Sequence, residues 1–436
     1  MPTSSSLPAV SALTHRRRGV ARPFTRLRRG GASAAAAFLA VLGPGLLAGL
    51  SDDDPAGITT YALLGTDFGY RLLWVIPAAT ILLTYFHLLA VEIGTATGRG
   101  FVALVRERWG RSAGHAAAIG LLFANFGTIC AEYAGIAAAA GMVGIPPWIS
   151  APLAGIVISC LVVLGSFQRI EGVLLVVSAT LSLYLLDGVI ASPDWRQVAW
   201  HTCVPHVPLD HAGWVALTAT VGTTLAPWGL AFIQSYAVDK KVRRADLPME
   251  RIEVVAGSLL TGVIGLAIAV ACAATLHQAG IRADSAEDVA VSLEPLAGRF
   301  ATVLFGGGLL GAAVLAAAVV PIATAYSVAE GIGAPASLGL DAHRFHAFYA
   351  VFVGLTVAAV SVVAIPGLPL FPLMVASQVV NAVLLPLHVV ALVLLAGRAD
   401  GAGRPPVGVG MRVVGWLGVA AIVACVVALA ASWVGT

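Results

Sequence analysis

The chain has 436 residues, of which 59% are hydrophobic and only 11% are charged, and its mean hydropathy is +0.92. A soluble protein of this length needs a far more charged surface, so the composition excludes a water-soluble globular fold. The formal net charge of +3 is too small to indicate a nucleic-acid partner. Apolar runs of about 20 residues recur without strand-like alternation, which predicts an all-α polytopic membrane protein with the lipid bilayer around it.

The first 34 residues differ in composition from the rest, being rich in arginine, serine and proline. Basic runs lie at 16–18 and 28–29, and we expect a disordered basic cytoplasmic tail over residues 1–34. Basic residues ahead of an apolar run are also typical of a signal peptide. The run that follows here carries three aspartates, and no small-residue cleavage site precedes it, which argues against that alternative.

Eleven apolar segments are long enough to be membrane spans. They cover residues 38–66, 72–94, 115–142, 147–165, 172–191, 213–238, 252–277, 299–331, 346–364, 371–396 and 411–433. With the tail inside, the inner loops carry the bases Arg99, Arg106, Arg108, Arg111, Arg169, Lys240, Lys241, Arg243, Arg244, Arg344, Arg398 and Arg404. The outer loops carry the acids Asp194, Asp210, Asp284, Glu287, Asp288 and Glu294. This asymmetry predicts a multi-pass plasma-membrane protein with a cytoplasmic N-terminus.

The first segment contains three consecutive aspartates, residues 52–54, followed by Pro55, Ala56 and Gly57. An ionisable group inside a membrane span is costly and usually marks a functional site. Proline interrupts helical hydrogen bonding and leaves backbone carbonyls available. Carboxylates beside a broken helix are a common cation site of secondary transporters. The alternative is that the aspartates cap a helix at the membrane surface.

A second break is expected at residues 226–229, inside the sixth segment, where Pro227 follows Ala226. The sixth segment comes five positions after the first, an odd number, so the two segments cross the membrane in opposite directions. This arrangement predicts two inverted five-helix repeats, about 38–191 and 213–396, with a binding site where the broken helices meet. The expected organisation is therefore a tail, a transporter core over 35–396, and a linker with an eleventh helix over 397–436.

Several motifs occur in an order that points to one family. They are Gly43-Pro44-Gly45, Asp54-Pro55-Ala56-Gly57, Thr97-Gly98-Arg99-Gly100, Glu132, Arg169-Ile170-Glu171 and Ser377-Gln378. This set resembles the Nramp divalent-metal transporters over nearly the whole chain, from about Gly43 to Pro386. The resemblance implies a LeuT-like fold of 5+5 inverted helices, with helices 1 and 6 broken and one extra C-terminal helix.

The departures from that family affect the groups associated with metal and proton movement. Ala226 stands where the family has methionine, Gly57 where it has asparagine, and Trp228 where it has histidine. Ile129 replaces an aspartate, and the segment 346–364 contains no arginine or lysine. This pattern resembles the Nramp-related magnesium transporters, which implies transport of Mg²⁺ and Mn²⁺ without obligatory proton coupling.

The candidate site follows from the breaks and the resemblance together. The expected metal-site residues are Asp54, Gly57, Ala226, Gln378 and Asp53, supported by Trp228, Glu132, Pro55, Pro227 and Thr59. Asp54 is the main carboxylate ligand, Ala226 offers its carbonyl, and Gln378 offers its amide oxygen or bonds a neighbouring helix. Asp53 and Asp52 lie on other faces of the helix and could line the outer vestibule or attract cations, and Asp52 fits that role as well as a ligand role. Glu132 supports the site or lies on a water path, or it makes a helix-to-helix hydrogen bond. Oxygen ligands without sulfur suit hard Mg²⁺, although Mn²⁺ accepts the same oxygens.

Other functions remain as alternatives. A proton-coupled Mn²⁺ or Fe²⁺ importer of the classical Nramp type would keep Thr59, Gln378 and Glu132, but the substituted groups argue against it. A carrier of an amino acid or other organic solute on the same architecture would receive the solute's carboxylate at the half-helix N-termini, where the three aspartates would repel it. An intramembrane enzyme is disfavoured, because the sequence has no HExxH or GxGD motif. We therefore expect no enzyme activity and no bound cofactor, and the sequence indicates no protein partner.

Overall fold

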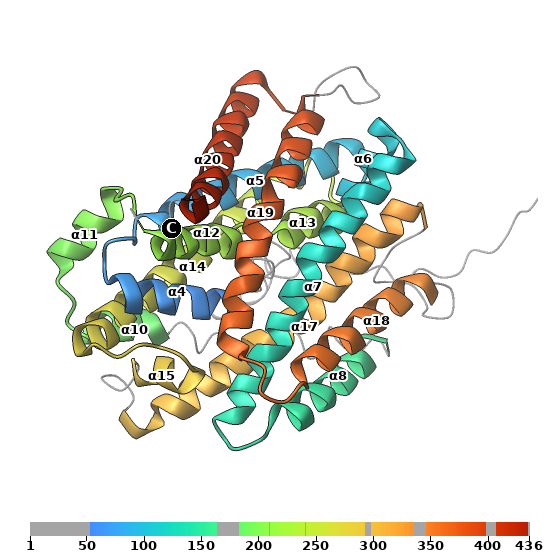
Figure 1. Cartoon of the computed structure of the whole chain (residues 1–436). Helices are drawn as coiled ribbons and strands as arrows, with labels where there is room; N and C mark the ends of the chain where they lie inside the picture. Colours follow the sequence, from blue (N-terminus) through green and yellow to red (C-terminus); the bar gives the residue numbers. More distant parts are fainter. Residues whose placement is uncertain are drawn as a thin grey trace, which may run out of the picture. The chain divides into compact units, whose positions relative to one another are not determined.

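The computed structural model describes residues 53–163, 183–208, 210–239, 241–292, 298–334, 346–397 and 407–434. All of these belong to one unit, residues 44–436, and each regular element in them is a helix (Figure 1). The predicted tail 1–34, Asp52 and the first half of the segment 38–66 lie outside the described residues.

Each of the eleven predicted segments contains a described helix. The helices are α4 Pro55–Phe68, α5 Val75–Thr97, α7 Arg111–Gly141, α8 Pro147–Val163, α10 Leu183–Ile190, α12 His211–Thr224, α13 Pro227–Asp239, α14 Leu247–Cys272, α17 Ala301–Ile332, α18 His346–Val363, α19 Leu370–Ala396 and α20 Val409–Val434. Among the described residues, seven helical stretches are long and apolar enough to cross a membrane, one of them composed of α12 and α13 together, and two shorter apolar helices accompany them. The prediction of an all-α polytopic membrane fold is confirmed.

Both predicted helix breaks fall next to a proline. Asp54 is extended (φ −75°, ψ 167°), and α4 begins at the next residue, Pro55, because proline fits the first helical position. In the sixth segment α12 ends at Thr224, and Leu225 leaves the helical region (φ −110°, ψ 56°) before α13 begins at Pro227. The second break therefore lies at 225–226, slightly ahead of the expected 226–229.

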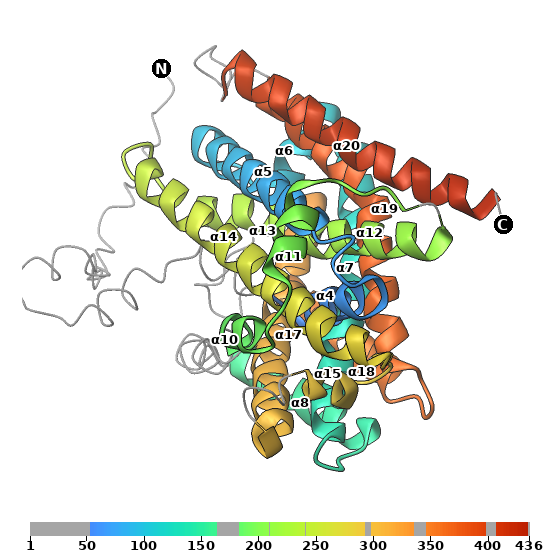
Figure 2. The same cartoon turned by 90° about the vertical axis from the view of Figure 1, so that its left-hand side faces the viewer.

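The helix packing follows the inverted repeat. The half-helix α4 packs on α14, the second helix of the other repeat, and the half-helix α13 packs on α5 in the equivalent way. α7 pairs with α17, and α8 pairs with α18, as Figure 1 shows. A glycine stands at each half-helix contact: a methyl group on Gly65 would overlap Ala269, and one on Gly94 would lie 2.8 Å from the Gln234 carbonyl. Figure 2 shows α14 crossing the bundle beside α4.

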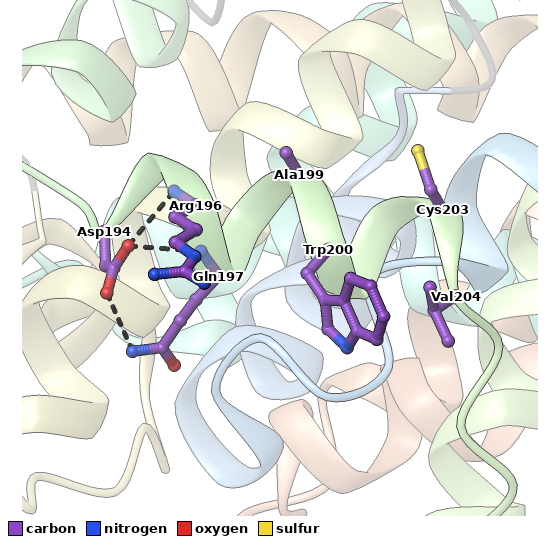
Figure 3. Close-up of a pocket in the computed structure, with 7 residues that line it drawn as sticks. All are labelled: Asp194, Arg196, Gln197, Ala199, Trp200, Cys203 and Val204. Atoms are coloured by element: carbon purple, nitrogen blue, oxygen red, sulfur yellow. Dashed lines mark hydrogen bonds between the residues drawn. The ribbon is translucent and has the colours of Figure 1, made fainter.

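Short helices in the loops were not predicted from hydropathy. They are α6 Phe101–Trp109, α11 Trp195–Cys203 and α15 Ala286–Val291. Two short turns extend predicted spans: the π-turn η2 Ala273–His277 continues α14, and the 3-10 turn η3 Gly298–Phe300 leads into α17. At the start of α11, Asp194 accepts hydrogen bonds from the backbone N–H groups of Arg196 and Gln197 (Figure 3). A single carboxylate thus satisfies two amides that a helix start leaves without partners.

Candidate metal site

Asp54 lies inside the protein, where it caps the N-terminus of α4. Its carboxyl is only 3% exposed, and Oδ1 accepts a 2.6 Å hydrogen bond from the Gly57 amide. The positive end of the α4 dipole also favours a negative charge here. Asp54 therefore does cap a helix, as the alternative expected. Its burial, however, places the carboxylate in the protein interior, where it is available to a cation.

Glu132 of α7 brings a second buried acid to the first. The Asp54 and Glu132 carboxyl groups are close enough to interact, and Glu132 is 0% exposed. Among the described residues, no N–H or O–H group donates to either oxygen of Glu132. Two neighbouring buried carboxylates repel each other unless a proton or a cation lies between them. The structure thus places Glu132, expected only as a supporting residue, beside the main carboxylate.

Close packing at Gly135 produces this pairing. Gly135 lies one helical turn beyond Glu132, and a methyl group on it would overlap the ring of Pro55. Because Pro55 directly follows Asp54, the contact brings the α7 backbone against the start of α4. A larger side chain at this position would separate the two helices and, with them, the two acids.

The two broken helices also meet. The Tyr61 hydroxyl of α4 lies 2.9 Å from the Thr224 hydroxyl, which is at the end of α12. Beyond Thr224, the Ala226 carbonyl accepts a 3.1 Å hydrogen bond from the Gly229 amide, so its second lone pair is the one left for a ligand. Trp228 is fully buried, and its indole N–H has no acceptor among the described residues. These contacts place the predicted break residues Ala226, Pro227 and Trp228 in the interior.

α19 contributes Gln378 and a residue that the sequence reading missed. The Thr59 hydroxyl donates to the Met374 sulfur at 3.6 Å, joining α4 to α19 one turn before Gln378. The Gln378 amide oxygen accepts a 2.9 Å hydrogen bond from Asn381 Nδ2. Asn381 is not among the site residues expected from the sequence, although an amide three residues beyond Gln378 in an apolar helix itself indicates a polar contact.

The structure also shows the surroundings of two other expected metal-site residues, Gly57 and Asp53. Gly57 uses its amide N–H to bind Asp54, so its described role is to hold that carboxylate. Asp53 is 2% exposed, which places it in the interior and not in an open vestibule. In the described part of the chain, no group of three or more His, Cys, Asp or Glu side chains is arranged to hold a metal ion. A cation here would rely on two carboxylates together with amide and carbonyl oxygens.

Comparison with known proteins decides the family. The model of the family described as "Natural resistance-associated macrophage protein-like" matches residues 45–432, which is most of the chain. The chain belongs to the Nramp family. This confirms the resemblance seen in its motifs.

One curated relative and two solved structures match the chain over most of their own length. A protein of Burkholderia ambifaria named "Divalent metal cation transporter MntH" is 28% identical over 406 residues, covering 91% of this chain and 89% of the relative. The crystal structure of an Eremococcus coleocola manganese transporter matches with a TM-score of 0.69 at 21% identity, covering 92% of this chain and 88% of that one. The structure of MhsT with L-phenylalanine matches with a TM-score of 0.56 at 17% identity, covering 90% and 98%.

These likenesses confirm the LeuT-like fold with its broken helices. They also confirm that this Nramp chain is not an enzyme, since the family members that it matches are transporters. The match to MhsT extends to a transporter structure with an amino acid bound, so the fold alone does not select the cargo. The residues at the breaks have to supply that argument.

Proposed function

We propose that this Nramp chain carries divalent metal cations, Mg²⁺ and/or Mn²⁺, across the cytoplasmic membrane by alternating access. The observation that carries the proposal is the pair of buried acids, Asp54 and Glu132, at the start of a half-helix. A divalent cation between them would neutralise both charges. The printed names of the relatives, a divalent metal cation transporter and a manganese transporter, support the same cargo class.

The oxygen-rich surroundings support a hard cation. Ala226 at the second break has no thioether, and its side chain is smaller than the methionine of the classical family. Mg²⁺ loses its waters reluctantly and is usually bound through one or two carboxylates together with water. Asp54 and Glu132 would supply the carboxylates, with Gln378 and the Ala226 carbonyl as neutral oxygens.

We further propose that proton movement is not obligatory. The segment 346–364 has no basic residue, and Trp228 and Ile129 stand where the classical family has titratable groups. The second candidate is a proton-coupled Mn²⁺ or Fe²⁺ importer. The acid pair favours it, because two close carboxyl groups can share one proton when no metal is bound.

Uptake into proteoliposomes distinguishes uncoupled transport of Mg²⁺ or Mn²⁺ from proton-coupled import of Mn²⁺ or Fe²⁺. The purified protein, with a metal-sensitive dye and a pH dye inside the vesicles, is compared with Asp54→Asn, which keeps a capping side chain but removes the charge. Entry of Mg²⁺ or Mn²⁺ that needs Asp54 and brings no acidification supports uncoupled transport. Entry of Mn²⁺ with acidification and without Mg²⁺ entry supports the second candidate. A wild-type protein that admits no divalent cation contradicts both.

The placement in the cell is part of the proposal. The loop charges support a plasma-membrane protein with its N-terminus in the cytoplasm. A cysteine introduced in the tail should react with a membrane-impermeant maleimide only after the cells are opened. Removal of residues 1–34 should leave metal uptake intact, and a loss of uptake would show that the tail takes part in transport.

A further inference from the structure

A backbone carbonyl sets the direction of a buried hydrogen-bond chain on α19. The Ser377 hydroxyl donates its only proton to the Met374 carbonyl at 2.6 Å. The Ser377 oxygen can then act only as an acceptor toward Gln378, whose Nε2 lies 3.2 Å away. The amino group of the Gln378 side chain therefore faces Ser377, and its oxygen faces the opposite way.

Asn381 completes the chain on the oxygen side. Its Nδ2 donates to the Gln378 Oε1 at 2.9 Å and to the Thr128 Oγ1 of α7 at 3.0 Å. An NH₂ group has two protons, one for each of these acceptors. Gln378 and Asn381 are at most 1% exposed, so water does not compete for these bonds. The Gln378 oxygen keeps a second lone pair that no described donor uses for a hydrogen bond.

The helices around this amide leave little room for movement. A methyl group on Gly222 of α12 would overlap the Gln378 carbonyl, so the two backbones touch there. Gly127 of α7 faces Ser377, and the next residue, Thr128, lies on the face of α7 that carries Glu132 four residues later. Asn381 therefore connects the helix that carries Gln378 with the face that carries the second acid.

We propose that Asn381 is a positioning residue for cation recognition. It holds the oxygen of the Gln378 amide on the side away from Ser377, and through Thr128 it keeps α19 in contact with the Glu132 face of α7. The inference rests on the proposed function, since Gln378 must face a cation for its orientation to matter. Without Asn381, only the 3.2 Å bond to Ser377 holds the amide, which can then rotate more freely and present N–H groups, which repel a cation.

A double-mutant cycle in proteoliposome uptake tests this role. Asn381→Leu removes the donor while keeping a similar volume, and the loss of one hydrogen bond predicts that the KM for Mg²⁺ and Mn²⁺ rises about three- to tenfold. Vmax should change less than KM, because the transport cycle itself remains. In a Gln378→Ala background, the same substitution should add almost nothing, since there is no amide left to orient.

Asn125→Leu is the matched control. Asn125 is a buried amide of α7 that donates to Thr324 of α17 at 2.8 Å, whereas the described hydrogen bonds of the Gln378 side chain go to Ser377 and Asn381. It should lose a comparable amount of thermal stability without the KM effect. Equal KM changes in Asn125→Leu and Asn381→Leu would mean that the loss of buried hydrogen bonds, and not orientation, is responsible, and would overturn the inference.

The remaining outcomes separate the inference from the proposed function. If the wild type takes up no divalent cation, the proposed function fails and the inference falls with it. If the wild type transports but Asn381→Leu and Gln378→Ala raise KM independently of each other, only the inference is overturned. If Asn381→Leu does not fold, Ser377→Ala takes its place in the cycle, because it releases the other end of the same amide.

Discussion

Gly135 of α7 lies directly against Pro55, the first residue of α4, with no space for a side chain between them. Glu132 stands one turn earlier on α7, and Asp54 stands immediately before the proline. This one contact between a glycine and a proline therefore sets the separation of the two buried acids.

Enlarging Gly135 should weaken cation binding. Gly135→Ala forces α7 away from α4, at a cost of about 1–3 kcal/mol for overpacking, and should raise the KM for uptake because the acids no longer share a ligand. Gly120→Ala is the control on the same helix, since a methyl group there meets nothing within 4 Å. An unchanged KM in Gly135→Ala would mean that Glu132 does not act together with Asp54.

Glu330 at the end of α17 should stabilise the loop helix α6. Its Oε2 accepts hydrogen bonds from the amides of Val102 and Ala103 at 3.0 and 3.1 Å, and its Oε1 accepts from the Ser235 hydroxyl at 2.7 Å. Glu330→Gln removes the charge and should lower stability by about 1–3 kcal/mol, since hydrogen bonds to charged groups are the stronger ones. Thermal unfolding in detergent measures this.

The control for that prediction is Glu107→Gln on α6 itself. The Glu107 carboxylate is 55% exposed in its ion pair with Arg99, and exposed pairs contribute little. Glu330→Gln should therefore have a clearly lower melting temperature than Glu107→Gln. Equal melting temperatures would contradict a stabilising role for the contacts of Glu330.

Met374 offers a test of ion preference. Its sulfur accepts from Thr59 on α4, and it is a buried thioether near the candidate site that was not expected from the sequence. Met374→Leu conserves volume and should cost less than about 1.5 kcal/mol in stability. If the ion is held by oxygen alone, the KM values for Mg²⁺ and Mn²⁺ should stay unchanged. A rise in the KM for the soft ion Cd²⁺ without a rise for Mg²⁺ would show that the sulfur takes part, since a thioether favours soft ions.

The start of α11 should open at low pH. Backbone and side-chain hydrogen bonds from Gln197, together with the Arg196 amide, hold the pKa of Asp194 below its ordinary value. A lowered pKa means that the stabilisation is complete at neutral pH and is lost as the pH falls through that pKa. Hydrogen exchange of the α11 amides should therefore lose protection in acid, and Asp194→Ala should remove both the protection and its pH dependence.

The membrane segments, the two breaks and Asp54 could be predicted because their causes are local. Hydropathy over about 20 residues predicts a span whatever surrounds it. A proline removes a backbone donor and fits the first helical position, so Pro55 and Pro227 indicated the breaks to within a residue or two, although Pro152, Pro321 and Pro386 lie inside the continuous helices α8, α17 and α19. Three aspartates in an apolar segment indicated a site without knowledge of any partner.

The sequence by itself determined the all-helical membrane fold and the inverted order of its broken helices, and it predicted Asp54 as the candidate carboxylate ligand. Only the tertiary structure decided that Glu132 faces Asp54 and that Asn381 orients Gln378. Both relationships depend on how far each helix is rotated and how closely its neighbour approaches at Gly135 and Gly222. Hydropathy carries no information on either quantity, because in an apolar helix almost every face is hydrophobic and the pattern does not indicate which face meets which neighbour.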